Sequence, residues 1–211
     1  MKIKNIIFDF DGVILNSMAI KTKAFRDLFS SYPKNVVDDF IEYHLKNGGV
    51  SRYRKIDYFH KQLLGIDISE KEILEYAQKY SSLTRNELTD PNYLIQDTFN
   101  FIKCNHSRYN MHIASGADEK DLIYICNGLE ISKYFMTING SPIIKSEIID
   151  TILTTYKYKK EETCLIGDSI NDHEAAKKNS ILFFGYNCKE LAHMNEYIST
   201  FNEFDMGAND E

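Results

Sequence analysis

An apolar run near the start of the chain ends in two carboxylates separated by one residue. The run from Ile6 to Phe8 leads into Asp9 and Asp11, and Gly12 follows directly. A short apolar run bounded by glycine is typical of a buried strand in a parallel sheet. Two ionised carboxylates at the end of such a strand are costly unless a cation neutralises them, which favours a hard metal ion such as Mg²⁺. The alternative is a strand followed by an acidic turn, since Asp-Gly is a common turn dipeptide.

The next seventy residues have helical periodicity and contain no strand pattern. Ser51 has the position of an N-cap, and Ser69 with Glu72 has the spacing of a capping box. Four helices that follow a single strand predict a separate helical lobe inserted into the fold. The predicted helices are Ile20 to Phe29, Val37 to Leu45, Ser51 to Gly65 and Ser69 to Tyr80.

Beyond Asp90 and Pro91, short apolar runs alternate with helical patterns. This alternation predicts a parallel sheet with right-handed crossovers and helices on both faces, in which ligands bind beyond the carboxyl ends of the strands. The predicted strands are Met111 to Ala114, Phe135 to Ile138, Thr163 to Ile166 and Ile181 to Phe184, and the predicted helices are Tyr93 to Ile102, Asp118 to Cys126, Ser146 to Tyr156 and Asp172 to Lys178.

Composition narrows the class of protein. With 211 residues, of which 43% are hydrophobic, the chain can form one full core or one core and a smaller lobe. The net charge of −6 argues against a general nucleic-acid binder. No apolar run has the length of a membrane span, and the first strand begins almost at once without a signal-peptide pattern. We therefore expect a cytoplasmic monomer with no membrane or nucleic-acid partner.

Polar residues follow several of the predicted strands, where a parallel sheet would bring them together. Ser115 and Gly116 follow the second strand, Lys145 precedes a helix, and Asp168 begins a turn that contains Asn171 and Asp172. Carboxylates suit a cation, while a hydroxyl group, a lysine and amides at a helix start suit a phosphoryl group. Each feature alone also fits a helix cap, a solvated lysine or an acidic turn.

The motifs FDFDGV, Ser115, Lys145 and GDSIND, in that order, resemble those of the haloacid dehalogenase superfamily. The resemblance is to its phosphatase branch with a helical cap, which includes proteins of the phosphoglycolate phosphatase and β-phosphoglucomutase type. It implies a Rossmann-like three-layer α/β/α core with an inserted, mobile cap. On this basis residues 1–15 and 90–211 form the core domain, and residues 16–89 form the cap domain.

The resemblance also implies a division of roles. Asp9 would be the nucleophile that forms an aspartyl-phosphate, and Asp11 would be the general acid and then the general base. Mg²⁺ would be held by Asp9, by Asp168, by the main-chain carbonyl of Asp11 and, through water, by Asp172. The phosphoryl group would be bound by Ser115, Gly116, Lys145 and Asn171.

The expected substrate is a small phosphomonoester such as a sugar, polyol or amino-alcohol phosphate. The expected contacts to it are Asn16, Ser51 and Arg52, whereas Arg54 and Lys55 are equally well explained as a solvated basic helix end. The segment from Asn47 to Lys55, which contains these residues, also resembles that of hydrolases found near bacterial surface-polysaccharide pathways.

Three alternative activities are weighed against hydrolysis. A carboxylate at Asp11 argues against the dehalogenase and ion-pump branches of the superfamily. The mutase branch typically has histidine where this chain has Lys21 and glutamate where it has Gly167, so both residues favour hydrolysis. A non-enzymatic phospho-aspartate signalling module is a further alternative, but response-regulator receivers lack the helical insert.

Overall fold

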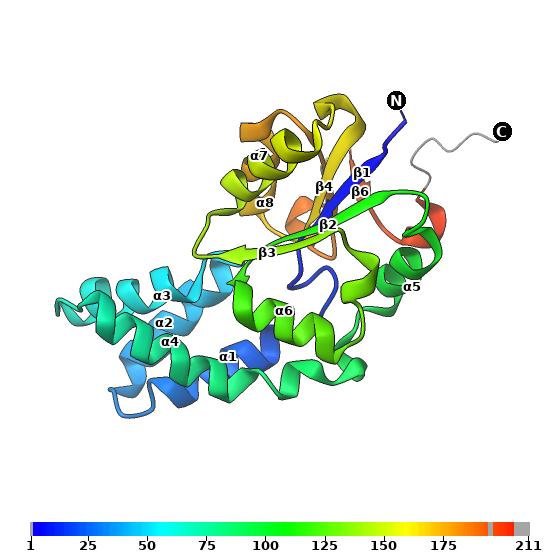
Figure 1. Ribbon diagram of the computed structural model, residues 1–211. Helices are drawn as coiled ribbons and strands as arrows, with labels where there is room; N and C mark the ends of the chain where they lie inside the picture. Colours follow the sequence, from blue (N-terminus) through cyan, green and yellow to red (C-terminus); the bar gives the residue numbers. More distant parts are fainter. Residues whose placement is uncertain (1, 194–195, 205–211) are drawn as a thin grey trace.

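The computed structural model describes residues 2–193 and 196–204. Its centre is a six-stranded parallel sheet with the order β3-β2-β1-β4-β5-β6 (Figure 1). The predicted parallel α/β architecture is therefore confirmed. The strands are β1 Asn5–Phe8, β2 Asn110–Asp118, β3 Thr137–Ser141, β4 Thr163–Gly167, β5 Leu182–Tyr186 and β6 Tyr197–Ile198.

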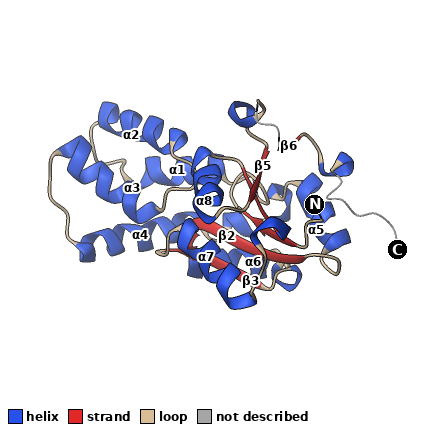
Figure 2. Cartoon of the chain, turned by 90° about the horizontal axis from the view of Figure 1, so that it is seen from above, coloured by secondary structure: helices blue, strands red, loops and turns tan. Residues whose placement is uncertain are grey.

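Alternate side chains of β1 enter cores on opposite faces of the sheet. Ile6 and Phe8 pack in the cluster that contains apolar residues of α5 (Gln96–Asn105) and α6 (Glu119–Gly128). Ile7 packs instead in the cluster of α7 (Lys145–Tyr156) and α8 (Ile170–Asn179). Figure 2 shows the resulting layers, with the red strands between blue helices. Burial on both faces explains why β1 is apolar without alternation.

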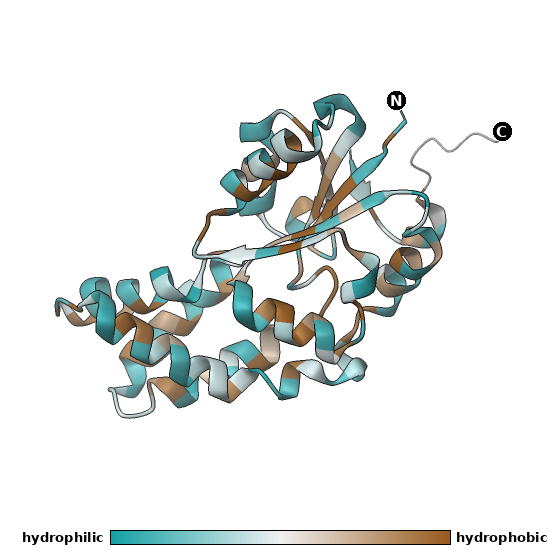
Figure 3. Cartoon of the chain, viewed as in Figure 1, coloured by the Kyte–Doolittle hydropathy of each residue, from teal (hydrophilic) through white to brown (hydrophobic). Residues whose placement is uncertain are grey.

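Four helices pack around an aromatic core of their own, on one side of the sheet domain. The core contains Phe25, Phe29, Phe40 and Phe59, and the rings of Phe29 and Phe59 are stacked with centroids 3.8 Å apart. Figure 3 shows both teal and brown turns along these helices, the amphipathic pattern that the periodicity predicted. They are α1 Met18–Leu28, α2 Lys34–Lys46, α3 Arg52–Tyr58, which continues as π-helix over Phe59–Leu64, and α4 Glu70–Thr84.

Several predicted boundaries were wrong. The helix predicted from Tyr93 begins at Gln96. The backbone N–H of Ile95 donates to the carbonyl oxygen of Ile14 and so holds the chain extended beside the segment between β1 and α1. The strand predicted at Phe135 to Ile138 is β3, which lies two to three residues later. The prediction missed its end because the residues Asn-Gly-Ser are polar. The short strand β6 was not predicted. No helix among the described residues is long and apolar enough to cross a membrane.

Candidate active site

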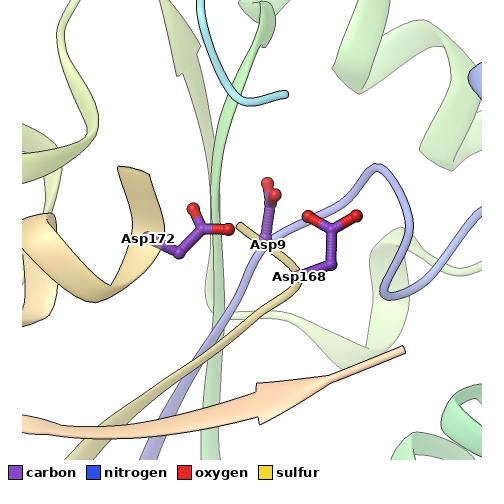
Figure 4. Close-up of side chains that lie close together, drawn as sticks. All are labelled: Asp9, Asp168 and Asp172. Carbon is purple, nitrogen blue, oxygen red and sulfur yellow. The ribbon is translucent and has the colours of Figure 1, made fainter. Parts of the chain in front are cut away.

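Three carboxylates from neighbouring segments meet at the carboxyl end of the sheet. Asp9 directly follows β1, Asp168 directly follows β4, and Asp172 lies in the first turn of α8. Strands β1 and β4 are paired in register, with Phe8 opposite Ile166, so the residues after them become neighbours. One oxygen from each carboxylate lies within 4.8 Å of the others (Figure 4).

Local backbone structure fixes two of these carboxylates. Ser169 and Asp172 form a capping box at the start of α8, in which the Asp172 carboxylate accepts from the Ser169 N–H at 3.1 Å. Asp168 lies against Gly12, which has a φ of 77°. A Cβ atom on Gly12 would be 1.9 Å from the Asp168 Oδ2, so only glycine fits the turn after Asp11.

Lys145 supplies the cation in contact with this group. It is the first residue of α7, and its Nζ lies 2.8 Å from the Asp9 Oδ1 and also contacts Asp172. Its side chain is almost fully buried, with 8% exposed. One ammonium faces three carboxylates, so the cluster has a surplus of negative charge.

This surplus raises the pKa values of two of the carboxylates. Burial, followed by the charge of Asp172, raises the pKa of Asp9 to about 7. Burial and the charge of Asp9 raise the pKa of Asp168 to about 8. Burial opposes the charged form of Lys145, but its two carboxylate partners outweigh burial and raise its pKa. Oxygen donors with uncompensated negative charge fit a divalent cation such as Mg²⁺.

Asp11 lies near this group but has separate partners. Its carboxylate accepts from the Ser17 hydroxyl at 2.5 Å and forms an ion pair of 2.5 Å with Lys21 on α1. Although burial opposes it, the Lys21 charge holds the pKa of Asp11 below its ordinary value. The sequence analysis had used Lys21 only as an argument against the mutase branch and had not predicted its ion pair with Asp11, although Ser17 and Lys21 are one helical turn apart and follow Asp11 closely.

Two of the expected phosphate-binding residues, Gly116 and Asn171, lie against a loop of the helical lobe. Ser115 is fully buried and accepts from the Ala117 N–H at 3.1 Å. A Cβ atom on Gly116 would be 2.0 Å from the Gly49 carbonyl oxygen, so the loop lies directly on Gly116. The Asn171 side-chain amide donates to the Gly48 carbonyl oxygen at 2.7 Å.

The three expected substrate contacts have different surroundings. Asn16 is exposed and lines neither cavity described below, while Ser51 caps α3. Arg52 is buried, and its guanidinium forms an ion pair of 2.6 Å with Asp121 on α6. Lys55 is also buried, because α3 turns this side chain toward α2, so the solvated helix end that the sequence left open for Lys55 is excluded.

Two cavities lie between the helical lobe and the sheet domain. The larger, of about 370 Å³, is lined by Gly116, Lys145 and Asn171 on the sheet side and by the start of α3. The smaller, of about 50 Å³, is lined by both Asp11 and Asp168. The smaller cavity therefore extends from the site carboxylates to side chains of α1, α2 and α3 in the helical lobe.

The comparisons with known proteins agree with this architecture. A family model described as "Haloacid dehalogenase-like hydrolase" matches residues 6–186. A "Phosphorylated carbohydrates phosphatase" of Thermotoga maritima is 24% identical over 183 residues, which are 83% of this chain and 81% of that protein.

Two solved structures are similar in fold. The β-phosphoglucomutase of Clostridium difficile has a TM-score of 0.78 and 19% identity, with 96% of this chain and 93% of that chain covered. YfnB of Bacillus subtilis, described as bound to magnesium, has a TM-score of 0.71 and 17% identity, with 96% and 97% covered.

Proposed function

Because the chain belongs to the haloacid dehalogenase-like hydrolase family, we propose that it is a magnesium-dependent phosphatase that acts on a small phosphomonoester through a phosphorylated Asp9. The observation that carries the proposal is the position of Asp9, buried at the end of β1, 2.8 Å from the Lys145 ammonium and beside two further carboxylates. A nucleophile, a charge-neutralising lysine and a set of metal ligands meet there, as phosphoryl transfer requires.

The cluster of carboxylates formed by Asp9, Asp168 and Asp172 fits a magnesium ion. Asp9, Asp168 and the main-chain carbonyl of Asp11 would hold the ion, and Asp172 would support it through water. When bound, the ion neutralises carboxylate charge and withdraws electron density from phosphoryl oxygens. YfnB, which is similar in fold, is described as bound to magnesium.

The chain's own residues provide two half-reactions. The Asp9 carboxylate attacks phosphorus, the bond to the ester oxygen breaks, and Asp11 gives its proton to the leaving alcohol. A water molecule then attacks the acyl-phosphate and gives its proton to Asp11, which releases phosphate and restores Asp9. Lys145 offsets the negative charge of the transferred group.

Binding of the phosphoryl group involves the loop of the helical lobe. The Ser115 hydroxyl, the Gly116 amide and the Asn171 side chain would donate to phosphoryl oxygens. The Asn171 amide donates to the Gly48 carbonyl oxygen and Gly49 lies on Gly116, so a shift of this loop would free Asn171 and expose Gly116 to a substrate.

Hydrolysis is favoured over phosphoryl transfer between sugar positions. A Cβ atom on Gly167 would be 2.4 Å from the Asp172 side chain, so the glutamate of the mutase branch has no room there. Lys21 occupies the position of the mutase histidine and is paired with Asp11. The name of the Thermotoga relative supports a sugar or polyol phosphate as substrate.

The test is release of phosphate from p-nitrophenyl phosphate with Mg²⁺ and with a chelator. We expect turnover that requires the metal and is lost in Asp9→Asn, with Asp27→Asn on the surface of α1 as the control. Turnover that persists in Asp9→Asn contradicts the covalent mechanism. A stable phosphoprotein without turnover of any phosphomonoester would instead support the signalling alternative. A screen of phosphorylated metabolites then identifies the substrate.

A further inference from the structure

Lys55 is a buried cation without a carboxylate partner. Its Nζ lies 2.9 Å from the Nδ1 of His44 and 3.4 Å from the His44 carbonyl oxygen, and only 4% of the residue is exposed. No carboxylate of residues 2–193 and 196–204 lies within 4.0 Å of this nitrogen. Buried charges in proteins are normally paired, so an isolated one requires an explanation.

His44 next to it has an unpaired polar atom. Burial, and then the charge of Lys55, lowers the pKa of His44 to about 3, so the ring is neutral near pH 7. Since Nδ1 accepts from Lys55, the proton of the neutral ring is on Nε2. That Nε2 is buried and has no hydrogen-bond partner among the described residues. Two neighbouring side chains therefore have hydrogen-bonding capacity that the protein does not use.

Both side chains line the smaller cavity, together with Asp11. The other two cations of this cavity are already neutralised, Lys21 by Asp11 and Arg52 by Asp121. In the proposed mechanism Asp11 protonates the leaving oxygen, so this cavity receives the alcohol part of the substrate. An acceptor on that part of the substrate would meet Lys55.

We infer that Lys55 and His44 bind a carboxylate on the leaving alcohol, so that the substrate is a phosphorylated hydroxy acid or sugar acid. The inference rests on the proposed phosphatase function. One ammonium balances the single charge of a carboxylate, whereas a second phosphate carries roughly 1.5 to 2 negative charges near pH 7. A carboxylate has enough lone pairs to accept from both side chains.

The pKa of Lys55 agrees with this assignment. Burial, and then the charge of Lys21, lowers its pKa to about 7. A carboxylate within ion-pairing distance favours the ammonium form and so offsets both causes. The groups that face Lys55 are Asp11 from the sheet side, Lys21 from α1 and His44 from α2.

The test compares two pairs of probes that differ only in the group far from the phosphate. The first pair is 6-phosphogluconate and sorbitol 6-phosphate, and the second is 3-phosphoglycerate and glycerol 3-phosphate. In each pair a carboxylate replaces a hydroxymethyl group. The two pairs differ in the distance between the phosphate and this group, so they test two distances between the phosphate and Lys55. We expect kcat/KM to favour the acid in at least one pair by about tenfold or more.

Variants assign the preference to Lys55. Lys55→Met should lower the ratio of kcat/KM for acid and alcohol by at least about tenfold, and Lys55→Arg should retain part of it. Lys61→Met removes the same charge from an exposed site of the helical lobe and should leave the ratio unchanged. A preference that persists in Lys55→Met overturns the inference.

The remaining outcomes separate this inference from the function on which it rests. No preference for the acid in the wild-type protein overturns the inference, and this result needs no variant to fold. A preference for fructose 1,6-bisphosphate over both acids overturns the assignment of a carboxylate. No turnover of p-nitrophenyl phosphate or of any probe overturns the phosphatase function itself, and the inference with it.

Discussion

Asp121 and Asp9 are carboxylates with the same burial and opposite surroundings. Each is 1% exposed. Asp121 accepts from two guanidinium groups, at 2.6 Å from Arg52 and 2.5 Å from Arg85. Asp9 has a single ammonium, that of Lys145, and two further carboxylates beside it. Burial opposes ionisation of both, but Ser81 and the arginines lower the pKa of Asp121, whereas the pKa of Asp9 is raised to about 7.

The difference separates a structural contact from a binding site. Asp121 on α6 is compensated within the protein, and its partners, Arg52 on α3 and Arg85 at the C-cap of α4, connect the helical lobe to the sheet domain. The carboxylates around Asp9 are not compensated within the described part of the protein, so a cation bound from solution would stabilise them. Lys55 is the same case with the sign reversed. The balance of buried charge therefore indicates where each ligand group binds.

The largest expected effect on the Asp9 side is on turnover. Asp9→Asn keeps the size of the side chain but removes the nucleophile, so kcat for p-nitrophenyl phosphate should fall by at least about a thousandfold. Steady-state kinetics at saturating Mg²⁺ measure it. A fall of less than tenfold would mean that Asp9 only positions other groups.

On the Asp121 side the expected effect is on stability. Asp121→Asn leaves Arg52 buried without its charge partner, which should lower the free energy of unfolding by about 3 to 5 kcal/mol. Urea denaturation measures this change. Asp38→Asn, which removes exposed ion pairs with Arg26 and Lys34, is the control and should leave the free energy of unfolding nearly unchanged. Equal effects of the two variants would remove the distinction between the two regions.

The dependence of stability on pH should differ between wild type and Asp168→Asn. In the metal-free protein the pKa of Asp168, about 8, lies above its unfolded value, so the folded state binds more protons. Its contribution is complete below about pH 4 and is lost as pH rises through about 8. Asp168→Asn should therefore reduce the loss of stability between pH 5 and 8 by something on the order of 2 kcal/mol.

Denaturation in chelator at several pH values measures this difference. Asp27→Asn, at an exposed ion pair with Lys23, is the matched control. If the free energy of unfolding depends on pH identically in wild type and Asp168→Asn, the negative charge at the site is already balanced.

The smallest expected effect is a shift of the pH profile in Lys21→Met. Removing the ammonium takes away the charge that lowers the pKa of Asp11, so this pKa should rise. Asp11 then remains protonated to higher pH, and the alkaline limb of the pH profile of kcat/KM should move to higher pH. Lys23→Met, exposed on the same helix, is the control. A limb that moves downward would contradict Asp11 as the general acid.

The sequence predicted the parts of the site that depend on local patterns. An apolar run followed by Asp9 predicted a strand end, and the helix predicted from Asp172 to Lys178 corresponds to α8, which begins two residues earlier at Ile170. The sequence could not predict which cations are compensated, because Arg52 and its partner Asp121 are 69 residues apart. For the same reason the sequence could not exclude a solvated Lys55, since the burial of this residue depends on how α3 packs against α2. The polar, short edge strand β3 lacked the apolar pattern that identifies β1.

Binding of Mg²⁺, measured by isothermal titration calorimetry, tests the central claim that uncompensated negative charge makes the Asp9 cluster a cation site. We expect the wild-type protein to bind a single ion and Asp168→Asn to bind at least about tenfold more weakly. Asp27→Asn should bind as the wild type does. Absence of binding to the wild-type protein, or equal affinity in Asp168→Asn, would contradict the claim.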